Sequence, residues 1–175
     1  MYSRKHVKAS ADDSLSGAAA LPPATAETAQ WVVFRLDTAH YALPLATVDR
    51  VVRAAQFTPL PLAPSIVLGA IDVEGHILPV FNARRRFRLP ARPMEPTDHF
   101  LIARTAHRTV VLLIDAALGV IEQPTTALIE AARLSPDLAH IRGVIRLRTG
   151  LVLIQDLEQF LSQDEAIALD QAMRQ

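Results

Sequence analysis

The sequence predicts a mostly β protein of two similar five-stranded units packed together, with short helices and a helix at the C-terminus. Three observations support this fold class. Short apolar runs alternate with turn residues, the second half repeats the pattern of the first, and the 175 residues are enough for a buried core. Each unit is expected to form a small closed or nearly closed barrel, and packing the two together buries more surface than either unit could alone.

The first unit begins at Trp31, where WVVFRL and YALPL form two short strands around a turn. The segment 48–52 (VDRVV) fits either a bent strand or a short helix. The segment 58–64 (TPLPLAP) has three prolines, which exclude helix interior and central strand, so it is an extended connection. The segment 69–82 (GAIDVEGHILPVFN) predicts a hairpin with a two-residue turn.

The second unit repeats this order of strands and turns. HFLIAR and TVVLLID flank a turn, and IRGVIRL and LVLIQDL form a closing hairpin. The stretches starting at Gly69 and Gly143 align without a gap, and their apolar runs end at Asn82 and Asp156. We expect subdomains of 45–97 and of 31–44 with 98–175.

The two ends of the chain differ. Residues 1–29 are rich in Ala, Ser, Thr and Pro and have almost no large apolar side chains, so we expect a disordered tail before a domain of 30–175. Ser162 and Glu165 have capping-box spacing and predict a C-terminal helix of about three turns. The segment 125–134 fits either one or two helical turns or a plain connection.

Composition excludes several function classes. Lys plus Arg equals Asp plus Glu, 18 each, so nothing indicates nucleic acid or an anionic membrane as a partner. The absence of cysteine removes thiol nucleophiles and Cys-ligated zinc. No apolar stretch has the length of a membrane helix. We expect a cytoplasmic protein without membrane insertion.

Sequence motifs give no support for catalysis. The nucleotide-binding, serine-hydrolase and helical zinc-ligand motifs are missing, and none of the six histidines has metal-ligand spacing. His40 and His107 fall in equivalent turns and are expected to be exposed. We expect no enzyme activity, no catalytic residue, no metal and no cofactor.

Two features could still have a function. Asp115 is either a buried functional carboxylate or, in the favoured interpretation, the end of a strand that hydrogen-bonds the next turn. The basic run 83–89 (ARRRFRL) is either a nucleic-acid patch or, in the favoured interpretation, a solvated helix or loop face. Neither feature establishes a reaction, which leaves a binding module as the expected function.

Four segments in order resemble the CheW-like domain family: WVVFRLDTAHYALPLATVDRVV, LPLAPSIVLGAIDVEGHILPVFNARRRF, VVLLIDAALGVIE and IRGVIRLRTGLVLIQDLEQFL. The resemblance runs from about Trp31 to about Met173. It implies two SH3-like barrels with an apolar seam between them. It also implies a scaffold that couples chemoreceptor tips to the regulatory domain of a CheA-type histidine kinase in bacterial chemotaxis, without catalysis or a cofactor.

The sequence departs from the family where partners bind. The family's Asn-Leu-Arg-Gly is here Asp-Val-Glu-Gly, so Glu74 stands before Gly75 in place of an arginine, and Arg50 stands where a glutamate is usual. We expect an Arg50–Glu74 ion pair of reversed polarity; the alternative is two unrelated surface charges.

Three further residues complete the expected partner-binding set. Val48 and Val51 are apolar contacts for the receptor tip, or else ordinary core. His99 replaces an apolar contact of the family with a titratable group. Two other functions stay open: an adaptor for twitching motility, surface sensing or polar localisation with non-standard partners, and a small enzyme or ligand-binding barrel.

Overall fold

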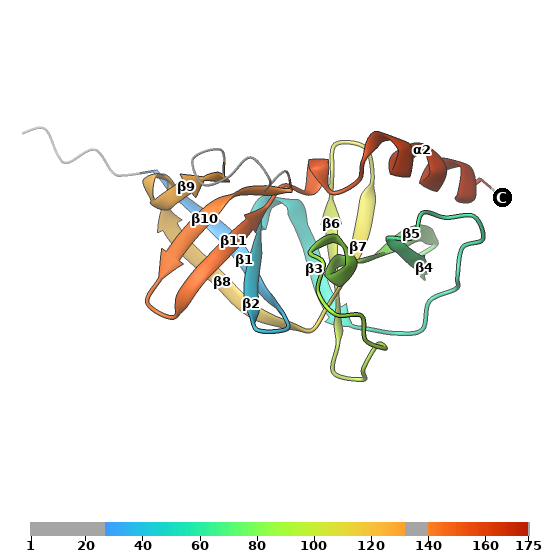
Figure 1. The fold of residues 1–175 in the computed structure, drawn as a ribbon, viewed down its shortest axis with the longest axis horizontal. Helices are drawn as coiled ribbons and strands as arrows, with labels where there is room; N and C mark the ends of the chain where they lie inside the picture. The colour runs from blue at the N-terminus through green and yellow to red at the C-terminus, as the bar shows by residue number, and fades with distance from the viewer. Residues whose placement is uncertain (1–26, 132–139, 175) are drawn as a thin grey trace, which may run out of the picture.

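The structure, a computed structural model, describes residues 27–131 and 140–174 and contains two β-sheets side by side (Figure 1). Most of the predicted disordered tail, residues 1–26, lies outside the described residues; the first strand begins at Thr28. The six-stranded sheet has the order β8-β1-β2-β11-β10-β9 and the five-stranded sheet the order β3-β6-β7-β5-β4. The mostly β prediction with two packed β subdomains is confirmed.

The six-stranded sheet consists of β1 (Thr28–Leu36), β2 (Ala39–Pro44), β8 (Ala116–Pro124), β9 (Leu128–Glu130), β10 (Ile141–Leu147) and β11 (Gly150–Gln155). The five-stranded sheet consists of β3 (Val48–Arg53), β4 (Val67–Val73), β5 (His76–Asn82), β6 (His99–Arg104) and β7 (Thr109–Ile114). The helices are η1 (Leu45–Thr47), α1 (Ala83–Arg86), η2 (Thr125–Ala127), η4 (Leu157–Gln159) and α2 (Gln163–Ala172).

The two halves of the chain exchange strands. The N-terminal half gives β1 and β2 to the six-stranded sheet and β3, β4 and β5 to the five-stranded sheet. The C-terminal half gives β6 and β7 to the five-stranded sheet and β8 to β11 to the six-stranded sheet. Each sheet therefore contains one parallel pair between the halves, β2 with β11 and β7 with β5. The expected subdomain division is wrong for 98–114, because β6 and β7 pair with β3 and β5 rather than with the strands of 31–44.

The gapless repeat predicted from Gly69 and Gly143 is present in three dimensions. Both glycines follow an interruption of the strand register, in the β4–β5 and β10–β11 hairpins. A Cβ on Gly69 would lie 2.3 Å from the Thr58 carbonyl oxygen, and one on Gly143 would lie 2.5 Å from that of Ile129. In both units a crossing backbone segment therefore excludes any side chain at this position.

The ends of the two hairpins are also equivalent. The Asn82 side chain accepts a hydrogen bond from the backbone N–H of Arg85 and begins α1. The Asp156 side chain accepts one from the N–H of Glu158 and begins η4. A short polar side chain at this position turns the chain from a strand into a helix in both halves.

The remaining sequence alternatives are settled by local structure. The segment 48–52 is the strand β3, and the segment 125–134 starts with the short helix η2 and strand β9, its remainder lying partly outside the described residues. The predicted C-terminal helix is α2, and Ser162 with Glu165 forms both halves of a capping box. Within the part of the chain that the structure describes, no helix has the length and apolarity needed to cross a membrane.

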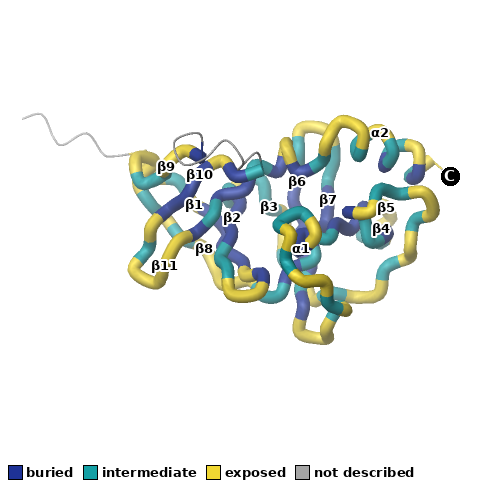
Figure 2. The backbone as a smooth tube through the Cα atoms, viewed as in Figure 1, coloured by how far each residue is buried: buried dark blue, intermediate teal, exposed yellow. Residues whose placement is uncertain are grey.

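The largest apolar core lies between the two sheets. Buried side chains of β1 and β2, such as Phe34 and Leu43, form one cluster with Phe81, Leu101 and Leu112 of the other sheet. Each sheet also has a smaller cluster of its own. Figure 2 shows this burial concentrated along the strands in the middle of the molecule. The apolar seam expected between the units is therefore the main core, and it holds them in one fixed arrangement.

Candidate functional site

Arg50 and Glu74 form the ion pair expected from the sequence. Arg50 Nη1 donates a hydrogen bond of 2.8 Å to Glu74 Oε1, and the Arg50 Nε lies 3.3 Å from Asp49 Oδ2. Both partners of the pair are exposed, with 42% of the Arg50 side chain and 72% of the Glu74 side chain accessible. The pair therefore presents two opposite charges to solvent and to any partner at this surface.

This ion pair joins the two edges of the five-stranded sheet. Arg50 lies on the edge strand β3, and Glu74 follows the edge strand β4 at the opposite side of the strand order. A β-bridge joins Ala70 of β4 to Thr58, which lies in the connection that follows β3. The sheet must curl for these contacts to form, as expected of a small nearly closed barrel.

The turn that carries Glu74 is built by its neighbours. Glu74 and Gly75 have φ angles of 55° and 84°, as a two-residue hairpin turn with two left-handed residues requires. The Gly75 N–H donates a hydrogen bond of 2.7 Å to Asp72 Oδ1, which fixes the turn. Glu74 is thus held at the tip of the β4–β5 hairpin, and Gly75 positions it.

Electrostatics favours the charged forms of the pair. The hydrogen bond from Arg50, together with the Arg50 charge, lowers the pKa of the Glu74 carboxyl below its ordinary value. The hydrogen bond to Glu74, with the Glu74 charge, raises the pKa of Arg50. The pair therefore stays ionised throughout the neutral range.

Val48 and Val51 lie on the same edge strand as Arg50. Both valines are partly buried and pack against the core between the sheets. Each valine therefore contacts the core and also keeps an accessible part. The two alternatives that the sequence left open, a core position and a partner contact, are thus compatible with each other. Val52 is 38% exposed and adds an apolar side chain to the outer part of β3.

His99 begins β6 and pairs across the strands with Arg53 and Ile114. Its side chain is partly buried, and its Nδ1 has no hydrogen-bond partner among the described residues. His99 therefore lies in the strand next to β3, and its ring has unused hydrogen-bonding capacity.

Sequence reasoning missed a network of buried charges between the sheets. Arg84 donates to Asp115 from Nε at 3.1 Å and from Nη2 at 2.6 Å, and Arg92 Nη2 donates to Asp115 at 2.8 Å. The backbone N–H of Asp37, in the β1–β2 turn, donates to the same carboxylate at 2.7 Å. Asp115 does follow the end of a strand, but the turn that it hydrogen-bonds is the distant β1–β2 turn rather than the next one favoured from the sequence. It also binds two guanidiniums.

The favoured interpretation of 83–89 as a solvated face is wrong for two of its arginines. Only 9% of the Arg84 side chain is accessible, and Arg86, 14% accessible, pairs at 2.5 Å with Glu165 in the first turn of α2. Arg85 and Arg88 are exposed. The available signal was an aspartate that directly follows a buried strand, because a carboxylate in that position needs a cation or several N–H donors.

The pKa of the Asp115 carboxyl reflects two opposing effects, burial and the surrounding donors and charges. Burial raises the pKa, but hydrogen bonds from Arg84 and the Asp37 N–H, with the charges of Arg84 and Arg92, lower it below the ordinary value. Arg92 in turn holds Asp98, which is 1% exposed, with two hydrogen bonds of 2.9 and 2.6 Å. This network connects the two sheets, and its role is to stabilise the fold.

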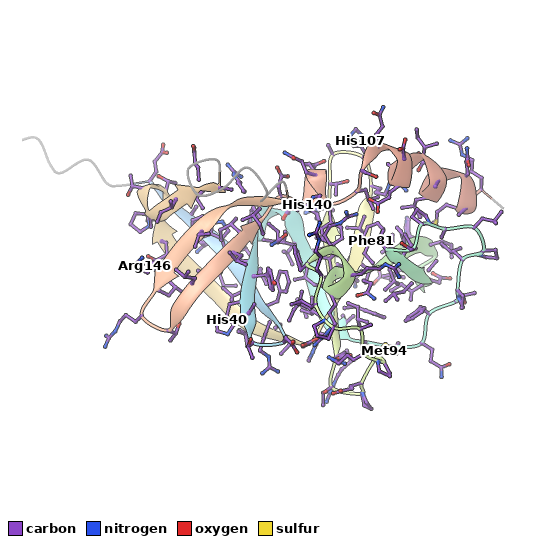
Figure 3. The ribbon with its side chains drawn as sticks, viewed as in Figure 1. His40, Phe81, Met94, His107, His140 and Arg146 are labelled. Carbon is purple, nitrogen blue, oxygen red and sulfur yellow. The ribbon has the colours of Figure 1, made fainter. Side chains whose placement is uncertain are left out.

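Histidines do not assemble a metal site in the described ranges. His40 lies in β2 rather than in the turn predicted for it, and His107 lies in the β6–β7 turn, well away from it (Figure 3). Among residues 27–131 and 140–174 no three His, Asp or Glu side chains come together as metal ligands.

Comparison with known proteins then identifies the family. The CheW-like domain profile matches residues 30–165. This chain belongs to the CheW-like domain family. Among curated CheW-like relatives, it is 26% identical over 149 residues to "Chemotaxis protein CheW" of Treponema pallidum, covering 79% of this chain and 85% of that protein. It is 26% identical over 119 residues to "Protein FrzA" of Myxococcus xanthus, covering 67% of this chain and 74% of that protein.

The fold of a solved CheW-like protein agrees with this assignment. The scaffolding protein TtCheW from Thermoanaerobacter tengcongensis superposes with a TM-score of 0.73 at 23% identity, covering 79% of this chain and 96% of that one. At this identity the similarity establishes the shared fold.

Proposed function

We propose that this chain is a non-catalytic adaptor that couples chemoreceptors to a CheA-type histidine kinase in a bacterial chemotaxis array. The match of the CheW-like domain to residues 30–165 carries this proposal, since it spans nearly all of the described chain. Relatives named as chemotaxis proteins, and a neighbour named as a scaffolding protein, support it. The adaptor works in the cytoplasm and is recruited to arrays at the membrane.

The partner-binding surface of this adaptor is centred on β3 and the β4–β5 turn. Val48 and Val51 supply apolar contact to the receptor tip, and Arg50 and Glu74 supply charge. Gly75 fixes the turn, and His99 borders the surface from β6. Charges at the rim of an interface act mainly on partner choice, because like charges that meet across it disfavour the wrong partner.

Binding of the purified chain to a kinase regulatory domain, measured by titration calorimetry, tests the proposal. Arg50→Glu and Glu74→Arg should each weaken binding several-fold. The double variant should recover part of the loss, because it restores an attractive pair. The control is Arg146→Glu, which also reverses an exposed arginine but lies on β10 of the other sheet.

Two results would contradict parts of this proposal. Losses that simply add in the double variant would remove the role of the pair in binding. Wild-type protein that binds neither a kinase regulatory domain nor a receptor cytoplasmic tip would reject the adaptor role in a conventional array.

The reversed charges also support a second candidate, an adaptor for twitching motility, surface sensing or polar localisation whose partners differ in charge. Tight binding to a conventional kinase regulatory domain favours chemotaxis. Binding only to a domain with the opposite charges at the facing positions favours this second candidate.

A further inference from the structure

A recess lies where the two sheets meet, next to the Arg50–Glu74 surface. It has a volume of about 200 Å³, and its polar wall consists of Thr47, Arg104, Arg142, Gln155, Asp156 and Glu158. Thr47 ends η1, which connects the sheets, and Arg104 ends β6. Arg142 and Gln155 belong to β10 and β11. Side chains from both sheets therefore line one small recess.

Gln155 is the unusual member of this wall. It is 2% exposed, yet neither its Nε2 nor its Oε1 has a hydrogen-bond partner in the described ranges. Buried amide groups are normally paired, because leaving one unpaired forfeits the hydrogen bonds that water would give it. Because Gln155 lines the recess, its unpaired carboxamide could pair with a polar group that enters there once the side chain turns toward it.

The carboxylates of this recess already have donors. Asp156 accepts from the N–H of Glu158 and from the side chain of Gln159, and Glu158 Oε1 accepts from the N–H of Ala106. The Thr47 hydroxyl donates to the Pro44 carbonyl. These groups hold the local backbone, and the two carboxylates use part of their acceptor capacity there.

The two arginines of the recess differ from its carboxylates. Arg104 and Arg142 are exposed, and neither forms an ion pair or a side-chain hydrogen bond with another residue of the described chain. A guanidinium offers five N–H donors in a planar fork that matches a carboxylate. The unused hydrogen-bonding capacity therefore consists mainly of donors.

We propose that this recess binds an acidic side chain of a partner protein, with the carboxylate at Arg104 and Arg142 and Gln155 paired to an adjacent amide of the same peptide. A carboxamide both donates and accepts, so it matches a peptide group. The volume of the recess accommodates one residue, which makes it a pocket for a single Glu or Asp rather than a groove for a helix.

The recess adjoins the candidate partner surface without sharing its residues. Thr47 precedes Val48 in the chain, and Arg104 follows Ala103, the strand partner of Val48. The choice of a protein rather than a metabolite as ligand rests on the proposed adaptor function. The pocket itself can be tested without a kinase or a receptor, so failure of one proposal is distinguishable from failure of the other.

The test uses the full chain and a capped pentapeptide, acetyl-Ala-Ala-Glu-Ala-Ala-amide, in an NMR titration. The side-chain amide resonances of Gln155 and the Nε–H resonances of Arg104 and Arg142 should shift with the glutamate peptide. They should shift at least five-fold less with the matching glutamine peptide. Arg104→Ala and Arg142→Ala, both at exposed positions, should each weaken the response several-fold, whereas Arg146→Ala should leave it unchanged.

Gln155→Leu provides an independent variant. It fills the wall with an apolar side chain of similar size, so the thermal midpoint should hold or rise while the peptide response is lost. Equal shifts with the glutamate and glutamine peptides would overturn the proposal, as would a response that survives both arginine substitutions. Free glutarate that binds more tightly than the glutamate peptide would overturn the choice of a protein ligand.

Discussion

The guanidinium of Arg84 meets the carboxylate of Asp115 through two parallel hydrogen bonds, of 3.1 and 2.6 Å, between the two sheets of this CheW-like domain. Asp115 lies between β7 of one sheet and β8 of the other, and its backbone N–H donates to the Arg35 carbonyl. Two-point pairing of this kind fixes orientation as well as distance. The relative placement of the sheets therefore depends on this contact in addition to the apolar core.

Replacing Arg84 by Met should destabilise the protein strongly. The change keeps the bulk of the side chain but leaves Asp115 with only Arg92 and the Asp37 N–H as donors. We expect a loss of about 3 kcal/mol in the free energy of unfolding, the low end for breaking a buried pair, because Arg92 remains. Urea denaturation measures this loss, with Arg85→Met at an exposed neighbouring position as the control. Equal stability of the two variants would show that the network contributes little.

Stability should fall in acid because of the same carboxylate. The pKa of Asp115 is lowered in the folded protein, despite burial that raises it, since Arg84 and the Asp37 N–H favour the charged form. Its contribution is therefore fully present above the unfolded pKa of ~3.9 and is lost as pH falls through the lower folded value. Denaturation midpoints between pH 6 and pH 3 should decrease more steeply for wild type than for Asp115→Asn. Parallel curves would contradict this assignment.

Gly69→Ala and Gly143→Ala should destabilise the protein by similar amounts. In each variant the new methyl group meets a backbone carbonyl oxygen, at 2.3 and 2.5 Å, and backbone cannot move aside as a flexible side chain can. We expect a cost of about 1–3 kcal/mol for each substitution. Gly75→Asn is the contrasting variant. Gly75 has a φ of 84°, which Asn tolerates, and a Cβ there would meet no atom within 4 Å, so the thermal unfolding midpoint should change little. If Gly69→Ala left the stability unchanged, the proposed equivalence of Gly69 and Gly143 would be wrong.

Charge reversal at Arg50 or Glu74 should leave the thermal midpoint almost unchanged. The pair is exposed, and exposed ion pairs contribute little to stability because solvent and salt screen them. Its effect should appear in partner affinity and should diminish as salt is added. Differential scanning calorimetry of both single variants checks this point, and a large fall in the midpoint would mean that lost binding reflects unfolding.

Much of the fold could be predicted because its signals are local. The turn at Glu74 and Gly75, the capping box at Ser162 and the register shared by Gly69 and Gly143 each depend on residues close together in sequence. The Arg50–Glu74 pair was expected from the family resemblance. Neither hydrophobic periodicity nor secondary-structure propensity would have identified this ion pair.

The errors concern long-range choices. β6 and β7 have the same local pattern in either sheet, so strand periodicity could not decide that they pair with β3 and β5. The basic run 83–89 is typical of a solvated face, and only the distant Asp115 explains why Arg84 is buried. Gln155 is the last residue of the apolar strand β11, and its sequence position indicates neither its burial nor the lack of a side-chain partner among the described residues.

The exchange of strands also determines how this chain could be divided. A cut in the connection between β5 and β6 leaves each fragment with pieces of both sheets and with a complete form of neither. Neither fragment could bury the shared core alone, so each should stay unfolded until it meets the other. Expressed separately, the two halves would act as a split protein whose reassembly reports their encounter inside a cell.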